Sequence, residues 1–216
     1  GEILPRAEAV VNPHREDCPS ERKELCGAGV ALKLVCALEG DSYVIDQYAD
    51  LVALGTVADV VPLVFESRKI VEKGLEMIRL GYRPSLTALL DVCGVEAAAS
   101  TSESIAFALA PRINAAGRMG SASLAVALLL SDEEDAYELA EEIAVKNKQR
   151  QKTETEILNN IEEQFKRYPR KLLQRVLVVS GEGFHPGVIG IIAARLCEKY
   201  GRPAVVIGVS DGVGKG

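Results

Sequence analysis

The sequence predicts an α/β protein in which a long helix joins two α/β domains, and three observations favour this architecture. Short apolar segments typical of strands occur near both ends of the chain, at 7–12, 174–180 and 204–209. Segments with helical periodicity lie between them. Residues 132–167 contain neither Gly nor Pro, and a helix of that length would span roughly 54 Å. We therefore expect domains at 1–131 and 169–216, with a connecting helix over 132–168.

Composition is typical of a water-soluble globular protein. The 216 residues are 48% hydrophobic and 26% charged, and no apolar run reaches the roughly 18 residues that a membrane span requires. Five scattered cysteines without a CxxC pair argue against a disulfide framework and a zinc site, so a reducing cytoplasm is expected. The net charge of −6 argues against broad coating of DNA, but it allows a locally basic cleft. Because residue 1 is Gly and the chain stops within the glycine-rich DGVGKG, we expect a piece of a longer protein.

The N-terminal half should be one short strand followed by helices. Glycine and proline mark the expected boundaries: Gly81 ends one helix and Pro84 opens the next. The expected elements are a strand at 7–12, a loop at 14–23, a buried helix at 27–38, helices at 67–80 and 85–92, a loop at 95–103 with Ser102 as helix N-cap, and a buried helix at 122–130.

The stretch DLVALGTVADVVPL, at 50–63, carries the first candidate site residue. Asp59 continues a helical face, and apolar side chains surround it in the sequence. Pro62 disfavours helix at Val61, so Asp59 should lie in the last helical turn. There its charge meets the negative helix end and a dry neighbourhood, and an Arg, a metal ion or a proton should offset it. The alternative is a carboxylate that caps a neighbouring loop.

A second candidate site lies in LAPRINAAGRMGSA, where Arg112, Asn114 and Arg118 alternate with small residues. Small neighbours allow close approach of a ligand, and guanidinium groups bind phosphates or carboxylates bidentately. A structural arginine clamp between loops is the alternative.

The long helix over 132–167 should be apolar at both ends and polar in its middle. Asn147, Arg150 and Glu154 continue the apolar stripe there, so we expect a bridge exposed on at least one face. Acidic residues open the helix and basic residues follow, which suits the helix dipole. The basic run KNKQRQK, with Lys148 and Arg150, could instead lie along a cleft and meet phosphates.

The C-terminal segment predicts a parallel strand–helix–strand unit. Strands at 174–180 and 204–209 flank a helix that ends at Tyr200, and the connection is expected to be right-handed. Free N–H groups where the loop GEGFHPGVIG enters the helix predict an anion site with His185 and Gly187. A lone His is more often structural. The closing GVGKG, with Lys215, departs from a Walker P-loop at both ends.

Four of these segments resemble motifs of one family, in that family's order. GTVADVVPL, LCGAGVALKL, APRINAAGRMG and GEGFHPGVIGIIAARL are similar to segments of DHH-superfamily phosphoesterases, in the form found in RecJ-type single-strand-specific exonucleases. The resemblance implies that Asp59 is a metal ligand and that Arg112, Asn114 and Arg118 border the groove for the strand. It implies that GVGKG begins a phosphate-binding loop and that 169–216 begins a DHHA1 domain. Phe184 stands where the family more often has Trp, which would keep a stacking ring.

The implied activity is 5′→3′ hydrolysis of phosphodiester bonds in single-stranded DNA with two Mn²⁺ or Mg²⁺ ions, in DNA repair and recombination. Residues 1–131 would be the end of the DHH domain, and the DHH triplet and other metal ligands would lie upstream. The chain alone would be inactive and monomeric, and a single-strand-binding protein or helicase would be its protein partner. Two alternatives remain: a phosphoesterase for short oligonucleotides or cyclic dinucleotides, and a non-catalytic nucleic-acid-binding or scaffolding subunit.

Overall fold

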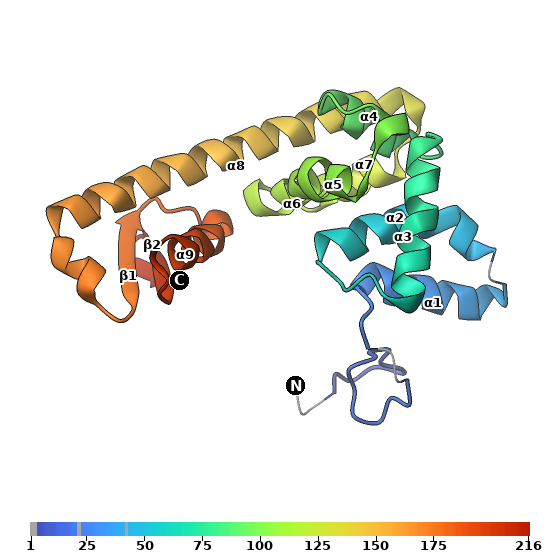
Figure 1. Ribbon diagram of the computed structural model, residues 1–216, viewed down its shortest axis with the longest axis horizontal. Helices are drawn as coiled ribbons and strands as arrows, with labels where there is room; N and C mark the ends of the chain where they lie inside the picture. Colours follow the sequence, from blue (N-terminus) through green and yellow to red (C-terminus); the bar gives the residue numbers. More distant parts are fainter. Residues whose placement is uncertain (1–3, 21–22, 42) are drawn as a thin grey trace. The chain divides into compact units, whose positions relative to one another are not determined.

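The computed structural model describes residues 4–20, 23–41 and 43–216 and contains mostly helix, with one small sheet (Figure 1). The chain packs as two units. Unit 1 comprises 1–111 and 131–137, and unit 2 comprises 112–130 and 138–216.

From Gly27 onward unit 1 consists of helices joined by turns, and its described residues form no strand. Its elements are α1 (Gly27–Glu39), α2 (Val44–Ala58), α3 (Phe65–Arg79), α4 (Pro84–Val92), the 3₁₀ turn η1 (Ala97–Ala99), α5 (Ser102–Ser104) and the π-helical turn η2 (Ile105–Leu109). A core of Leu32, Val44, Ala49, Val52, Ile70 and Met77 joins the first three helices. Gly74 lets α3 approach α2 closely, because a Cβ there would collide with the Ala49 carbonyl.

The prediction of a strand at 7–12 is wrong. These residues form no strand, because none of the residues that the structure describes pairs with them, and an unpaired extended segment has no ladder of hydrogen bonds to stabilise it. The expected cap at Ser102 is displaced by one residue. Thr101 is the N-cap, and its hydroxyl and that of Ser104 form a capping box.

Unit 2 contains the sheet and most of the long helix. Its elements are α6 (Ala110–Met119, whose first two residues belong to unit 1), α7 (Ser123–Leu130), α8 (Glu133–Arg167), the 3₁₀ turn η3 (Pro169–Leu173), β1 (Leu177–Glu182), α9 (Pro186–Tyr200), β2 (Ala204–Ser210) and β3 (Val213–Lys215). The parallel pair β1–β2 is confirmed, with Leu177 opposite Ala204. A core of side chains from α8, α9 and both strands includes Ile161, Leu177, Val188, Ile192 and Val206.

The closing DGVGKG forms a hairpin, which was not among the predicted elements. Asp211 and Gly212 have φ of 52° and 75°, and Ser210 pairs with Val213 across them. Two consecutive left-handed residues with an Asp-Gly sequence are typical of a tight hairpin turn. Lys215 therefore lies on the edge strand β3, antiparallel to β2, rather than in an open glycine loop.

The long helix α8 is continuous over 35 residues, as expected. One face of its middle, including Lys148 and Lys152, is exposed, which is also as expected. The polar stripe on the other face is buried, however: Asn147 and Glu154 are 3% and 2% exposed. The charged side chains of this buried stripe form their ion pairs within unit 2.

Candidate carboxylate and nucleic-acid-binding residues

Asp59 caps the C-terminal end of α2 and is exposed to solvent. The Val60 N–H donates to the Val57 carbonyl and the Val61 N–H donates to the Thr56 carbonyl, both at 3.1 Å, so the helix ends in a Schellman motif. With the residues that the structure describes, the Asp59 carboxylate forms no hydrogen bond or ion pair. The predicted helix end is confirmed, whereas the predicted dry neighbourhood is wrong, because the chain turns away here and leaves Asp59 and Val60 protruding.

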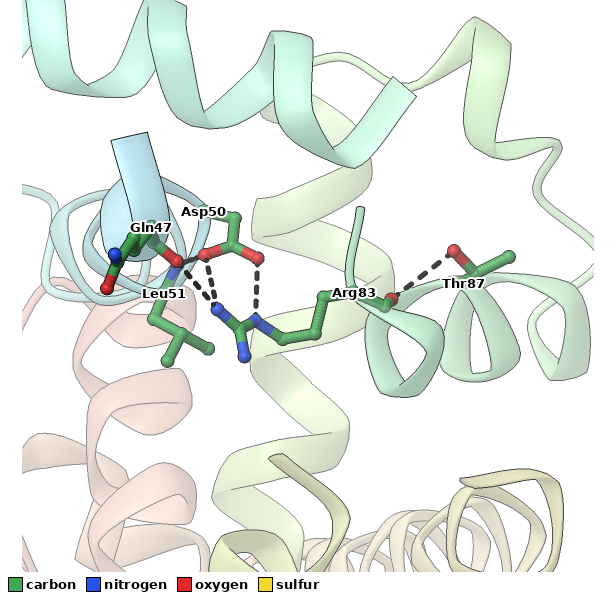
Figure 2. A network of polar contacts seen from close by, with 5 residues as sticks. All are labelled: Gln47, Asp50, Leu51, Arg83 and Thr87. Atoms are coloured by element: carbon green, nitrogen blue, oxygen red, sulfur yellow. Dashed lines mark hydrogen bonds and ion pairs between the residues drawn. The ribbon is translucent and has the colours of Figure 1, made fainter. Parts of the chain in front are cut away.

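The buried carboxylate of α2 is Asp50, which is fully buried (Figure 2). Its Oδ2 accepts from Nε of Arg83 at 2.6 Å and its Oδ1 from Nη2 at 3.1 Å. The sequence predicts a desolvated anion at Asp59, offset by an Arg, a metal ion or a proton. The desolvated anion is instead Asp50, earlier on the same helix, and an arginine offsets it. The sequence carried a weak signal for it, since Asp50 interrupts an otherwise apolar run.

The described residues do not by themselves fit a divalent metal ion. Among them no three His, Cys, Asp or Glu side chains converge, and Asp59 supplies a single carboxylate. A magnesium-type ion requires near-octahedral coordination by about six oxygen atoms. No chemical step through a metal is therefore derived from these residues.

Three of the predicted nucleic-acid-binding residues come together in unit 2, where α6 meets the start of α9. Nη1 of Arg118 donates to the Gly187 carbonyl at 3.2 Å. A Cβ on Gly187 would collide with the Arg118 carbonyl oxygen, so glycine is required for this approach. His185 is the N-cap of α9, and its Nδ1 accepts from the Gly187 N–H at 3.1 Å. The neutral ring therefore carries its hydrogen on Nε2.

The remaining predicted residues of α6 lie on two faces. Asn114 and Arg118 are exposed and four residues apart, so they share one face of the helix. Arg112 is half-buried and lies on a different face. Asn114 and Arg118 are thus accessible to a ligand together, and Arg112 is less so.

A pocket of 560 Å³ lies at the carboxyl ends of the parallel strands. Its lining includes His185, Lys215 and Asp211, so two basic groups and one carboxylate face it. The ligands of open parallel sheets bind at such strand ends. Phe184 also borders this pocket but is only 6% exposed, because Gly181 leaves room for its ring and Gly208 leaves room for its backbone carbonyl. Phe184 therefore belongs to the core, and the expected stacking ring is wrong.

Arg150 is held in a buried network on α8. Its Nε donates to Asn147 Oδ1 at 3.3 Å, and its Nη1 lies 3.4 Å from Glu154 Oε2. Nη2 of Arg195, on α9, lies 2.6 Å from the other Glu154 oxygen. Two arginines therefore offset one buried carboxylate, a role for Arg150 that its place in a basic run does not predict. Lys148, by contrast, is exposed and available to a ligand.

None of the described helices is long and apolar enough to cross a membrane.

No protein-family model matches the chain. Single-stranded-DNA-specific exonuclease RecJ of Bacillus subtilis is 41% identical over the whole chain, which covers 27% of that protein. The RecJ of Dickeya dadantii is 39% identical over the whole chain, which covers 41% of it.

Solved structures similar in fold to this chain are also RecJ proteins. The crystal structure of RecJ in complex with Mn²⁺ from Thermus thermophilus matches with a TM-score of 0.81 and 32% identity, over 96% of this chain and 31% of that one. A crystal structure of exonuclease RecJ bound to manganese matches with a TM-score of 0.77 and 34% identity, over 88% of this chain and 48% of that one. The chain spans roughly a quarter to two fifths of the length of the relatives named above, 27% and 41%. The chain is similar to RecJ proteins in sequence over its whole length and in fold over 96% of its length, and it therefore belongs to the RecJ family.

Proposed function

We propose that this chain is a segment of a single-stranded-DNA-specific exonuclease that hydrolyses phosphodiester bonds with Mn²⁺ or Mg²⁺. The observation that carries the proposal is 41% identity over the whole chain to an exonuclease of that name. Fold similarity to a RecJ structure that contains Mn²⁺ supports it. The 5′→3′ polarity and the role in repair and recombination belong to the same proposal.

Within this protein, each unit has a distinct task. Asp59 is the residue of this chain that would hold a metal ion, and the ion would supply the Lewis-acid chemistry of phosphodiester hydrolysis. Its exposure and the absence of any partner within the described residues leave both of its oxygens available. The remaining ligands would come from other parts of the longer protein.

Unit 2 would hold the strand through its backbone. Arg118, Asn114 and Lys148 are exposed, and His185 and Lys215 border the pocket at the strand ends. These residues offer cations and N–H donors, which position phosphates without reading the base sequence. We further propose that 1–131 is the end of the catalytic domain, of which 112–130 pack in unit 2 and contribute to holding the strand. Residues 132–168 would be the connector, and 169–216 would begin the second strand-binding domain.

The test is a chimera in which these 216 residues replace the matching segment of the Bacillus subtilis RecJ. The proposal expects Mn²⁺-dependent release of nucleotides from single-stranded DNA, with a labelled 5′ or 3′ end reporting the polarity. Duplex DNA of the same sequence is the matched control and should be resistant.

Substrate length separates the alternatives. An exonuclease should degrade strands of tens of nucleotides progressively, whereas a phosphoesterase for dinucleotides should act on the shortest substrates alone. A chimera that folds and binds strands but hydrolyses none of them would favour the non-catalytic subunit and overturn the proposal.

A further inference from the structure

Three helices of unit 1 end in the same hydrogen-bonded motif, with different residues at its left-handed position. In α3 and α4 the position is Gly81 and Gly94, with φ of 67° and 71°. The Gly81 N–H donates to the Ile78 carbonyl at 3.1 Å and the Gly94 N–H donates to the Asp91 carbonyl at 2.8 Å, as the Val60 N–H donates to the Val57 carbonyl. In α2 the position is Val60, with φ of 54°.

Valine is poorly suited to this position. Glycine adopts the left-handed region freely, whereas a Cβ clashes with the following carbonyl oxygen, and a β-branched residue there is an outlier. Packing does not compensate, because Val60 is 85% exposed. The two motif hydrogen bonds, each 3.1 Å long, therefore hold Val60 in this conformation against its own preference.

The far end of the same connection is also strained. Phe65, the first residue of α3, has φ of 47° and is exposed. The segment 61–64 thus lies between two bulky residues with positive φ. The third described non-glycine residue of this kind, Asp211, sits in a hairpin turn that favours Asp. Strain of this kind occurs preferentially at functional sites.

We propose that Val60 is a positioning residue that makes the end of α2 a strained hinge, so that the neighbouring Asp59 carboxylate can take two positions. In one position Val60 is left-handed, as observed. In the other Val60 is extended, both motif bonds are broken and the last helical turn is open. The strain lowers the free energy of that opening, because release of Val60 recovers its conformational cost. The link to catalysis rests on the proposed role of Asp59 as a metal ligand; the hinge itself does not.

Hydrogen exchange of this chain tests the hinge directly. Protection factors of the Val60 and Val61 amides should be lower than those of Gly81 and Tyr82 in the matching motif by roughly five- to thirtyfold. Val60→Gly should raise them to the level of the α3 end and raise the melting temperature by roughly 2–4 °C. The reciprocal variant Gly94→Val should lower protection at the α4 end, because a Cβ there has no neighbour within 4 Å and adds only backbone strain. Equal protection at the native α2 and α3 ends, or no change in Val60→Gly, would overturn the hinge.

Activity of the chimera tests the consequence for Asp59. Val60→Gly should lower kcat several-fold at an unchanged KM for the strand. The reason is that glycine favours the observed left-handed position too strongly over the extended one. Val60→Asn, which tolerates the left-handed region, should behave in the same way, and the β-branched Val60→Ile should retain kcat. Unchanged kcat in both Val60→Gly and Val60→Asn would overturn the proposal that catalysis uses two positions of the Asp59 carboxylate. An inactive parent chimera would instead count against the proposed function, and hydrogen exchange would still decide the hinge.

Discussion

Asp50 and Arg83 form a bidentate ion pair that ties α2 to the residue preceding α4 (Figure 2). The carboxylate is completely buried, and Nη2 of the arginine also donates to the Gln47 carbonyl at 3.1 Å. A carboxylate removed from water in this way depends on its partner, because that partner, together with a local N–H group, offsets the cost of its desolvation.

Loss of Arg83 should therefore strongly destabilise unit 1. We expect Arg83→Met to lower the free energy of unfolding by about 3–5 kcal/mol, because it leaves an uncompensated buried charge. The double variant Asp50→Leu/Arg83→Met should lose much less. Lys73→Met, which breaks the exposed Lys73–Asp46 pair, is the control and should cost less than about 1 kcal/mol. Denaturant titration measures all three, and equal losses for Arg83→Met and Lys73→Met would contradict the assignment.

The isolated 216-residue chain should hydrolyse nothing. Its described residues bring a single exposed carboxylate, Asp59, to the proposed metal site, and two-metal chemistry needs several ligands. Incubation of the purified chain with labelled single-stranded DNA and Mn²⁺ checks this. Sustained, metal-dependent nucleotide release that copurifies with the chain would refute it.

In the active chimera, Asp59→Ala should abolish turnover and leave strand binding within a few-fold of the parent. The reason is that Asp59 would hold a metal ion, whereas unit 2 would hold the strand. Glu39→Ala is the matched control, since Glu39 is also an exposed carboxylate at a helix C-terminal end. If Asp59→Ala remains nearly as active as Glu39→Ala, Asp59 has only a structural role.

Arg118→Ala in the same chimera should weaken binding about equally for strands of any sequence. A lost phosphate contact should also flatten the plot of log binding constant against log salt by roughly one unit. Arg112→Ala is expected to act in the same direction, and Arg170→Ala, which removes an exposed arginine of η3, should leave the slope unchanged. A changed base preference at an unchanged slope would show that these arginines read bases.

The pair between Glu162 and Lys199 should make the stability of unit 2 depend on pH. Their hydrogen bond lowers the pKa of Glu162 and raises that of Lys199. A carboxyl group whose pKa is lowered by folding stabilises above its unfolded pKa, about 4.3, and loses that contribution as pH falls through its folded pKa. Glu162→Gln should therefore lower the melting temperature at pH 7 and make no difference well below pH 4. Glu163→Gln, an exposed neighbour, is the control; an equal deficit of Glu162→Gln at both pH values would contradict the linkage.

Features with local causes could be predicted from the sequence. The end of α3 before Gly81, the start of α4 at Pro84 and the uninterrupted α8 follow from glycine, proline and periodicity. The parallel pair β1–β2 follows from two apolar segments separated by a helix. The proximity of Arg118 to Gly187 was not derivable, because 69 residues separate them.

What the sequence determined by itself is the order of the helices, the strand–helix–strand unit and the set of residues that bear chemistry, because backbone preferences and side-chain periodicity act over a few residues. Tertiary structure alone decided which of those residues are buried. Asp50 and Asp59 lie on the same segment, but an arginine 33 residues beyond Asp50 in the sequence reaches that carboxylate and none of the described residues pairs with Asp59. Phe184 is buried because Gly181 leaves space for its ring and Gly208 for its backbone carbonyl. The segment 7–12 is not a strand because no described segment pairs with it. Burial and pairing depend on contacts between distant parts of the chain, and local sequence patterns do not encode those contacts.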